Sequence, residues 1–128
     1  MSPRPEIHDC AVRTVDPARV EHVRTHAPDR QTLESSAEIF ALLGDANRLV
    51  LLTCLLEAGE LCVCDLAAAA GMTESSVSHA LRLMRARRVV KVRRDGRVAF
   101  YSLLDSHVRV LLDIALEHVK HADPLKEV

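Results

Sequence analysis

Four metal-ligand residues near the C-terminus constrain how this chain can fold and assemble. They are Asp105, His107, His118 and His121, in the segment DSHVRVLLDIALEHVKH, whose apolar residues recur at helical spacing. At about 100° per residue, His118 lies about 20° around the helix from His107, and His121 about 40° to the other side. The three histidines therefore form one stripe. Asp105 stands at the start of the helix, where a carboxylate can act as N-cap as well as ligand.

The quartet is too extended for one helix to place it around a single ion. Eleven residues at about 1.5 Å each put His107 and His118 about 16 Å apart. One ion can be shared only if Asp105 and His107 of one chain meet His118 and His121 of a second, antiparallel copy. A two-fold axis then makes two four-ligand sites, so the quartet predicts a metal-binding homodimer. The alternative is that the histidines belong to an ordinary polar helix surface.

Composition limits the class of protein. A chain of 128 residues is expected to form one domain, and with no Trp, one Tyr and two Phe its core must consist of Leu, Val and Ala. The net charge of −1 gives no sign of nucleic-acid binding by the chain as a whole. There is no apolar run of about 18 residues, and the first residues, MSPRPEIHDC, lack a hydrophobic signal region. We therefore expect a cytoplasmic bacterial protein with its four cysteines reduced or bound to metal.

The first part of the chain predicts an arm followed by helices. Residues 1–31 are polar and contain four prolines, so we expect a flexible N-terminal arm with at most a short helix near Ala18–Thr25. Helical spacing begins at about residue 32, and SSAEIFALLG ends a first helix at Gly44. Asp45 caps a second helix that ends at Gly59. The segment from 32 to 123 is the predicted DNA-binding and dimerisation domain, and 124–128 is a tail.

The next segments predict a winged helix-turn-helix. ELCVCDLAAAAG is a short helix stopped by Gly71, and TESSVSHALRLMRARR is a second helix with Thr73 as N-cap. VVKVRRDGRVAFYSLL alternates like two strands with Asp95–Gly96 as the turn. The last helix is expected at about 106–121. The fold class is thus mainly α with a β-hairpin, with extra dimerisation helices at both ends.

Basic residues gather where such a fold meets DNA. Between Arg82 and Arg97 lie eight of the seventeen Lys and Arg residues and one acid, Asp95. A basic patch supplies phosphate contacts, and short polar side chains early on the recognition helix can read bases. The predicted DNA-binding residues are Ser75, Ser76, Ser78, His79, Arg82, Arg93, Arg94 and Arg97. The alternative is a solvated basic surface without a DNA partner.

Cys62 and Cys64 form a second candidate metal site. Residues two apart in a regular helix face about 200° apart, so both thiolates can bind one ion only if the helix starts between them. Two thiolates need further ligands; Cys10, with His8 or Asp9 beside it, is the natural source, and His22 and His26 are further candidates. Thiolates favour Cd²⁺, Pb²⁺ or Zn²⁺. The alternative is a pair of small buried residues, the role we assign to Cys54.

The run from CVCDL through SSVSHAL and the DGR turn to the terminal quartet resembles the ArsR/SmtB metal-sensing repressors, over about 33–121. The resemblance implies a homodimeric winged-helix repressor whose metal-free form binds a palindromic operator. Binding of Zn²⁺, Cd²⁺ or Pb²⁺ would weaken DNA binding and release metal efflux or sequestration genes. For the inter-subunit site, the resemblance implies the ligands Asp105, His107, His118 and His121. For the thiolate site, it implies Cys62, Cys64 and Cys10. It also places Ser78 and His79 on the recognition helix.

One departure concerns the arm. Cadmium-type members of this family often carry a second arm cysteine, and here the stretch Ile7-His8-Asp9 holds that place. The thiolate site is then either a three-cysteine site completed by His, Asp or water, with His8 as one option, or vestigial.

Three rival functions follow from the same residues. An arsenite-responsive repressor would use Cys62 and Cys64 and ignore the terminal quartet. A zinc hydrolase would need an open coordination position and a nearby general base, and the only extra carboxylate by the quartet, Glu117, is expected to point elsewhere on the helix. A dimeric interaction module would bind no metal at all.

Overall fold

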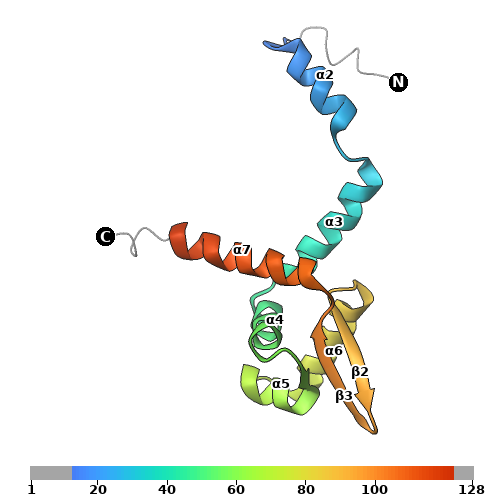
Figure 1. Cartoon of the computed structure of the whole chain (residues 1–128), viewed down its shortest axis with the longest axis vertical. Helices are drawn as coiled ribbons and strands as arrows, with labels where there is room; N and C mark the ends of the chain where they lie inside the picture. Colours follow the sequence, from blue (N-terminus) through green and yellow to red (C-terminus); the bar gives the residue numbers. More distant parts are fainter. Residues whose placement is uncertain (1–12, 123–128) are drawn as a thin grey trace. The chain divides into compact units, whose positions relative to one another are not determined.

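The computed structural model describes residues 13–122 and divides the chain into two units, Met1–Glu34 and Ser35–Val128, with the division inside α3 (Arg30–Leu43). In the first unit, α2 (Pro17–His26) begins after Asp16, whose carboxylate accepts a hydrogen bond from the backbone N–H of Arg19 at 3.1 Å. Proline at the first helical position suits this start. The predicted short helix is confirmed, and α3 begins a few residues before the expected position (Figure 1).

In the second unit, capping residues set the helix bounds as the sequence predicts. Asp45 caps α4 (Ala46–Ala58) by accepting from the backbone N–H of Asn47 at 2.8 Å. Thr73 caps α6 (Glu74–Ala86) by accepting from the backbone N–H of Ser76 at 3.1 Å. Gly71 ends α5 (Val63–Ala70) in the left-handed conformation, with φ at +68°, where a residue with a Cβ is strained. α5, its turn and α6 form the predicted helix-turn-helix.

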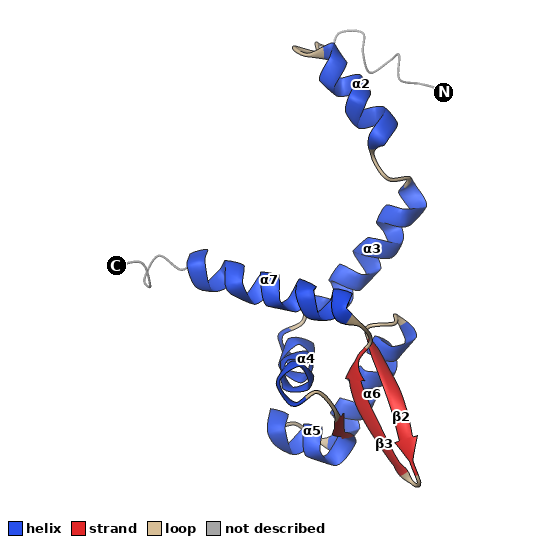
Figure 2. Ribbon diagram, viewed as in Figure 1, coloured by secondary structure: helices blue, strands red, loops and turns tan. Residues whose placement is uncertain are grey.

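The sheet contains one strand more than the predicted hairpin. β2 (Val90–Asp95) and β3 (Val98–Leu103) form the predicted antiparallel hairpin, and β1 (Leu61–Cys62) pairs with the other edge of β3, giving the order β1-β3-β2 (Figure 2). The predicted Asp95–Gly96 turn is wrong by one residue. Asp95 pairs with Val98, and Gly96 and Arg97 form the turn, with Gly96 at φ +66°. A glycine with positive φ in the first turn position is typical of type II′ hairpins. We call β2, β3 and their turn the wing.

The core is aliphatic, as composition predicts. The largest side chains that are fully buried are Leu51, Leu52, Leu55, Leu66, Leu81, Met84, Val77, Val89 and Val90. They come from α4, α5, α6, the first residue of β2 and the residue before it, so the leucines of α4 pack against both the helix-turn-helix and the sheet. The winged helix-turn-helix fold class is confirmed.

The last helix, α7 (Ser106–Ala122), is mostly outside this core. Leu112 is its one buried residue among those described, with Val108 and Leu111 partly buried against the core. Figure 1 shows the second half of α7 standing clear of the other elements of its unit. Within residues 13–122 no single helix is long and apolar enough to cross a membrane; α3 and α4, bent by 88° at their junction, pass that test by length and composition only as a pair.

Candidate metal sites and DNA-binding surface

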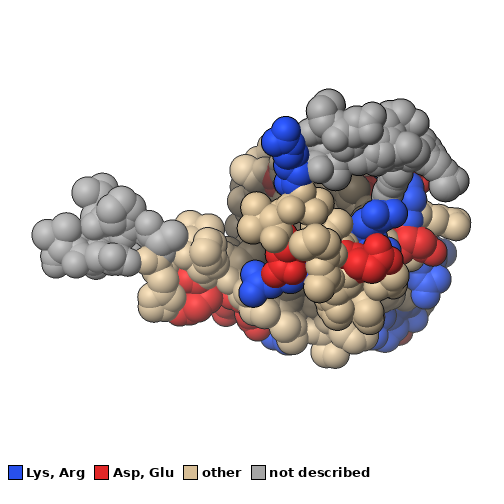
Figure 3. Space-filling view, turned by 90° about the horizontal axis from the view of Figure 1, so that it is seen from above, with Lys and Arg blue, Asp and Glu red and all other residues tan. Residues whose placement is uncertain are grey.

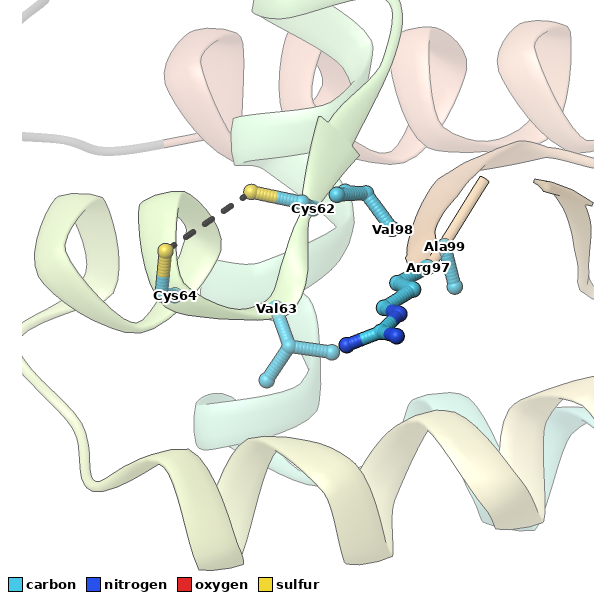
Figure 4. A pocket seen from close by; sticks show the side chains of 6 residues that line it. All are labelled: Cys62, Val63, Cys64, Arg97, Val98 and Ala99. Carbon is cyan, nitrogen blue, oxygen red and sulfur yellow. Dashed lines mark hydrogen bonds between the residues drawn. The ribbon is translucent and has the colours of Figure 1, made fainter. Parts of the chain in front are cut away.

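Cys62 and Cys64 are brought together by the junction of β1 and α5. Cys62 ends β1 in an extended conformation and is the N-cap of α5, and Cys64 is the second residue of that helix. The helix therefore starts between them, as a shared ion requires, and their Sγ atoms lie 3.8 Å apart (Figure 4). Two thiolates at about 2.3 Å from a tetrahedral zinc ion stand about 3.8 Å apart. The pair thus fits a thiophilic metal without rearrangement.

Asp65 adds an oxygen ligand to this cysteine pair. Its carboxylate lies 3.9 Å from Cys64 Sγ, and the three ligand atoms lie within 4.8 Å of one another. In residues 13–122 this is the one cluster of three or more such groups that the fold assembles. The hydrogen bond with the neighbouring Cys62 thiol is the largest cause that raises the pKa of Cys64, and charge repulsion from Cys62 adds to it. A divalent cation held by Cys62 and Cys64 would offset that repulsion. Cys10 and His8 lie outside the described residues.

An open pocket of about 290 Å³ adjoins the cysteine pair. It is lined by Cys62, Val63, Cys64, Arg97, Val98 and Ala99. In Figure 4 the two sulfur atoms point toward one another at one end, and the Arg97 guanidinium from the wing turn lies near Val63 at the other. The wing turn and the cysteine segment therefore border the same space. Cys54, in contrast, is half-buried and packs against the core, as predicted.

Asp105 and His107 form one half of the terminal quartet. Asp105 Oδ1 accepts from the backbone N–H groups of His107 at 3.0 Å and Val108 at 3.2 Å, so it is the predicted N-cap of α7. Its Oδ2 lies 3.4 Å from Nδ1 of His107, whose side chain is 92% exposed. The hydrogen bond from Val108, followed by the contact with His107, lowers the pKa of Asp105. The carboxylate is therefore ionised at neutral pH and suited to a cation.

The other half corrects the expectation for Glu117. His118 and His121 are exposed near the end of α7, and His121 Nε2 lies 2.6 Å from Glu117 Oε2. Glu117 does not point elsewhere: it contacts a predicted ligand, one helical turn away. Figure 3 shows acidic side chains exposed on the part of α7 that leads to the grey C-terminal residues. A carboxylate that holds a histidine is a common partner of metal ligands.

Apolar side chains lie between the two halves of the quartet. Val110 and Ile114 are 52% and 62% exposed, and at about 100° per residue they lie about 60° and 20° from His107 around α7. This stripe of α7 thus combines candidate ligands with apolar side chains that are solvent-exposed in a single protomer. Within one chain, Asp105 and His107 lie far from His118 and His121, as expected from their spacing along the helix. The shared inter-subunit site stays a prediction.

The recognition helix presents most of its predicted DNA contacts. Ser75, Ser76, His79 and Arg82 are exposed on α6, and Ser78 is half-buried. Ser76 also belongs to the helix cap, because the Thr73 hydroxyl donates to Ser76 Oγ at 2.9 Å. Ser75, His79 and Arg82 follow helical spacing and face one side, so they form one exposed surface of α6.

The wing presents its arginines unequally. Arg94 and Arg97 are exposed, and no ion pair of either is found within residues 13–122. Arg93 instead donates from Nε to Glu60 Oε2 at 3.0 Å and from Nη2 to Oε1 at 2.8 Å. The hydrogen bonds between them lower the pKa of Glu60 and raise the pKa of Arg93. Arg93 is one of the predicted DNA contacts, and its partner Glu60, 33 positions earlier, is not among the predicted site residues.

Comparison with known sequences agrees with this geometry. A family model described as "Bacterial regulatory protein, arsR family" matches residues 45–92. A "Transcriptional repressor SmtB homolog" of Synechocystis is 45% identical over 81% of this chain and 80% of its own length. The "HTH-type transcriptional regulator NmtR" of Mycobacterium tuberculosis is 44% identical over 77% of this chain and 82% of its own. A "Cadmium resistance transcriptional regulatory protein CadC homolog" of Staphylococcus aureus is 38% identical over 64% and 68%.

Solved structures share the fold. The homodimeric winged helix-turn-helix DNA-binding domain of Mb0332 from Mycobacterium bovis has a TM-score of 0.65 and 27% identity, over 75% of this chain and 94% of its own. The AntR antimony-specific transcriptional repressor has a TM-score of 0.61 and 30% identity, over 96% of this chain and 97% of its own.

Proposed function

We propose a metal-responsive repressor, on the premise that this chain belongs to the arsR family of bacterial regulatory proteins. Its metal-free dimer would bind a palindromic operator. The dimer would release the operator when Zn²⁺, Cd²⁺ or Pb²⁺ binds. The chain is a DNA-binding transcription regulator of the winged-helix type and not an enzyme. The hydrolase hypothesis is therefore set aside. The regulated genes would be those of metal efflux or sequestration.

The observation that carries this proposal is the 3.8 Å separation of the Cys62 and Cys64 sulfurs. It equals the edge of a tetrahedral metal–thiolate site, in a chain whose relatives include a cadmium resistance regulator. We assign Cys62 and Cys64 as ligands, with Cys10 from the arm as the third and His8 or Asp65 as options for the fourth. Such a soft donor set suits Cd²⁺, Pb²⁺ and Zn²⁺.

The second proposed site joins two subunits along α7. Asp105 and His107 of one protomer would meet His118 and His121 of its partner, giving an oxygen and three nitrogen ligands of the kind zinc prefers. The exposed Val110 and Ile114 between them supply apolar surface for the contact. A dimer with an axis through α7 also provides the paired recognition helices that a palindromic operator needs.

DNA binding would use α6 and the wing. Ser75, Ser76, Ser78 and His79 are the proposed base-reading residues, and Arg82, Arg94 and Arg97 are the proposed phosphate contacts. Metal lowers DNA affinity only if it binds more tightly to the conformation that fits the operator poorly. A coupling of about 1–3 kcal/mol is usual for allosteric proteins. Operator DNA and reduced thiols are both found in the bacterial cytoplasm, where we expect the protein to act.

The test is a DNA titration with and without metal. The probe is a duplex selected by the metal-free protein from a random-sequence library, and binding is followed by fluorescence anisotropy. We expect Zn²⁺ and Cd²⁺ to lower the affinity by about 5- to 150-fold. Cys64→Ser should remove the Cd²⁺ response, and His118→Ala should remove the response through α7. Cys54→Ser is the matched control and should respond like the unchanged protein. If neither metal changes the affinity, the proposal fails.

A second candidate is a response to trivalent arsenic or antimony. The Cys62–Cys64 pair presents two adjacent thiols, and the antimony-specific repressor AntR covers nearly the whole chain. This candidate predicts that arsenite or antimonite releases DNA, that Cys62→Ser abolishes the effect, and that His118→Ala leaves it unchanged.

A further inference from the structure

A row of paired residues crosses the sheet from the cysteine segment to the wing. In the register of the sheet, Cys62 on β1 is opposite Phe100 on β3, and Phe100 is opposite Arg93 on β2. Residues directly opposite one another in a sheet place their side chains on the same face. Cys62, Phe100 and Arg93 therefore share one face, and Phe100 stands between the candidate metal ligand and the wing arginine.

Glu60 connects the two ends of this row. It precedes β1 and is two residues before Cys62, and it binds Arg93 with both carboxylate oxygens, at 2.8 and 3.0 Å. The Arg93 guanidinium carbon also lies 4.8 Å from the centre of the Phe100 ring, within the range of a cation–π contact. A two-point ion pair fixes the direction of the guanidinium because its donors are rigid.

The contacts of Arg93 indicate that it positions the wing, rather than that it stabilises the fold or binds DNA. The Arg93 and Glu60 side chains are 55% and 37% exposed, and an ion pair this exposed adds little to the free energy of unfolding. Its donors are nevertheless turned toward Glu60, and its charge is matched by a carboxylate. Arg94, the next residue of β2, alternates to the opposite face and has no such partner among the described residues.

We propose that Glu60 and Arg93 are positioning residues that tie the wing to the Cys62–Cys64 segment, and that Arg93 is not a phosphate contact. This inference rests on the proposed function, because it gives the route by which metal at the cysteines reaches the DNA-binding surface. Cys62 and Cys64 would both be held by a bound metal ion, and the backbone of β1 would be restrained with them. Glu60 is on the same short segment, and Phe100 on β3 is paired with Cys62 on β1, so the wing would take its orientation from the metal site.

The test compares neighbouring arginines. Arg93→Gln, Glu60→Gln and the control Arg94→Gln are assayed as full chains on the selected duplex over a series of salt concentrations, with and without Cd²⁺. Cd²⁺ loading is checked by the thiolate-to-metal absorption band. Arg94→Gln should weaken DNA binding. It should also reduce the salt slope, the steepness with which the logarithm of the DNA-binding constant falls with the logarithm of the salt concentration, by about 0.9 for each lost phosphate contact, about 1.8 per dimer. The full Cd²⁺ response should be kept. Arg93→Gln and Glu60→Gln should keep the salt slope and lose most of the fold-change caused by Cd²⁺.

The opposite pattern overturns the inference. It is wrong if Arg93→Gln lowers the salt slope as Arg94→Gln does and keeps the Cd²⁺ response, or if Glu60→Gln responds to Cd²⁺ like the unchanged protein. If Arg93→Gln does not fold, Glu60→Gln alone decides between these outcomes.

A measurement without DNA separates this inference from the proposed function. The Arg93 Nε–H resonance reports its bond to Glu60, and we expect it to shift when Cd²⁺ fills the cysteine site. If Cd²⁺ leaves the DNA affinity of the unchanged protein constant, the proposed function fails. The Arg93 resonance then still tests whether the cysteine site is coupled to Arg93. An unshifted resonance in the Cd²⁺-loaded protein refutes the link whatever the DNA titration shows.

Discussion

Mixed dimers test whether α7 builds its metal site from two chains. One variant carries Asp105→Ala and His107→Ala, and the other carries His118→Ala and His121→Ala, both with Cys62 and Cys64 changed to Ser so that only the terminal sites bind. Zinc–nitrogen bonds are about 2.0–2.1 Å, so two ligands of one ion are at most about 4 Å apart. His107 and His118 are about 16 Å apart along one helix, and one chain cannot supply both.

The expected stoichiometries follow from this geometry. Neither double variant alone keeps a four-ligand site, and a mixed dimer keeps one. Random exchange of subunits makes about half of the dimers mixed, so the mixture should bind about a quarter of the Zn²⁺ that the parent dimer binds. Binding is measured by competition with a chromogenic chelator after the exchange of subunits is confirmed by mass spectrometry. Recovery of no site on mixing, or full binding by either variant alone, would refute the two-chain site.

Three further predictions concern the core, a turn and the thiols. Leu81 is 1% exposed and Leu83 is 38% exposed on the same helix, so Leu81→Ala should lower the free energy of unfolding by about 3–5 kcal/mol and Leu83→Ala by less than about 1.5 kcal/mol, as measured by urea denaturation. Gly71→Ala should cost about 1–2 kcal/mol in the same assay, because φ is +68° and a Cβ there is strained even though it meets no atom within 4 Å. Cd²⁺ affinity at Cys62 and Cys64 should rise from pH 6 to pH 8, because both thiols lose protons on binding and the pKa of Cys64 is raised; a pH-independent affinity, measured by chelator competition, contradicts thiolate ligation.

The helices of this fold could be predicted because their ends depend on local residues. Asp45 and Thr73 each accept the hydrogen bond of a backbone N–H two or three residues later, and Gly71 adopts a conformation that other residues resist. A reader of the sequence sees all three signals within a few positions of the helix they bound.

β1 could not be predicted, because it exists through its partner. Two residues are too short to show the alternation that marks a strand, and Leu61 and Cys62 become a strand only by pairing with Tyr101 and Phe100. The Glu60–Arg93 ion pair could not be predicted either, because its two residues are far apart in sequence and meet only in the folded chain. The candidate ligands were found by residue type and spacing, whereas the contacts of Glu60 with Arg93 and of Glu117 with His121 are seen only in the folded chain.

Cys62 is the N-cap of α5, so the cysteine that we propose as a metal ligand lowers the stability of the metal-free fold. Its side chain accepts no capping hydrogen bond from a backbone N–H of the helix, whereas Ser, Thr, Asp or Asn at this position would stabilise the helix by about 1 kcal/mol. Cys62→Ser should therefore unfold at a higher urea concentration than the metal-free parent while binding less Cd²⁺, so that the loss of metal in this variant is separated from damage to the fold.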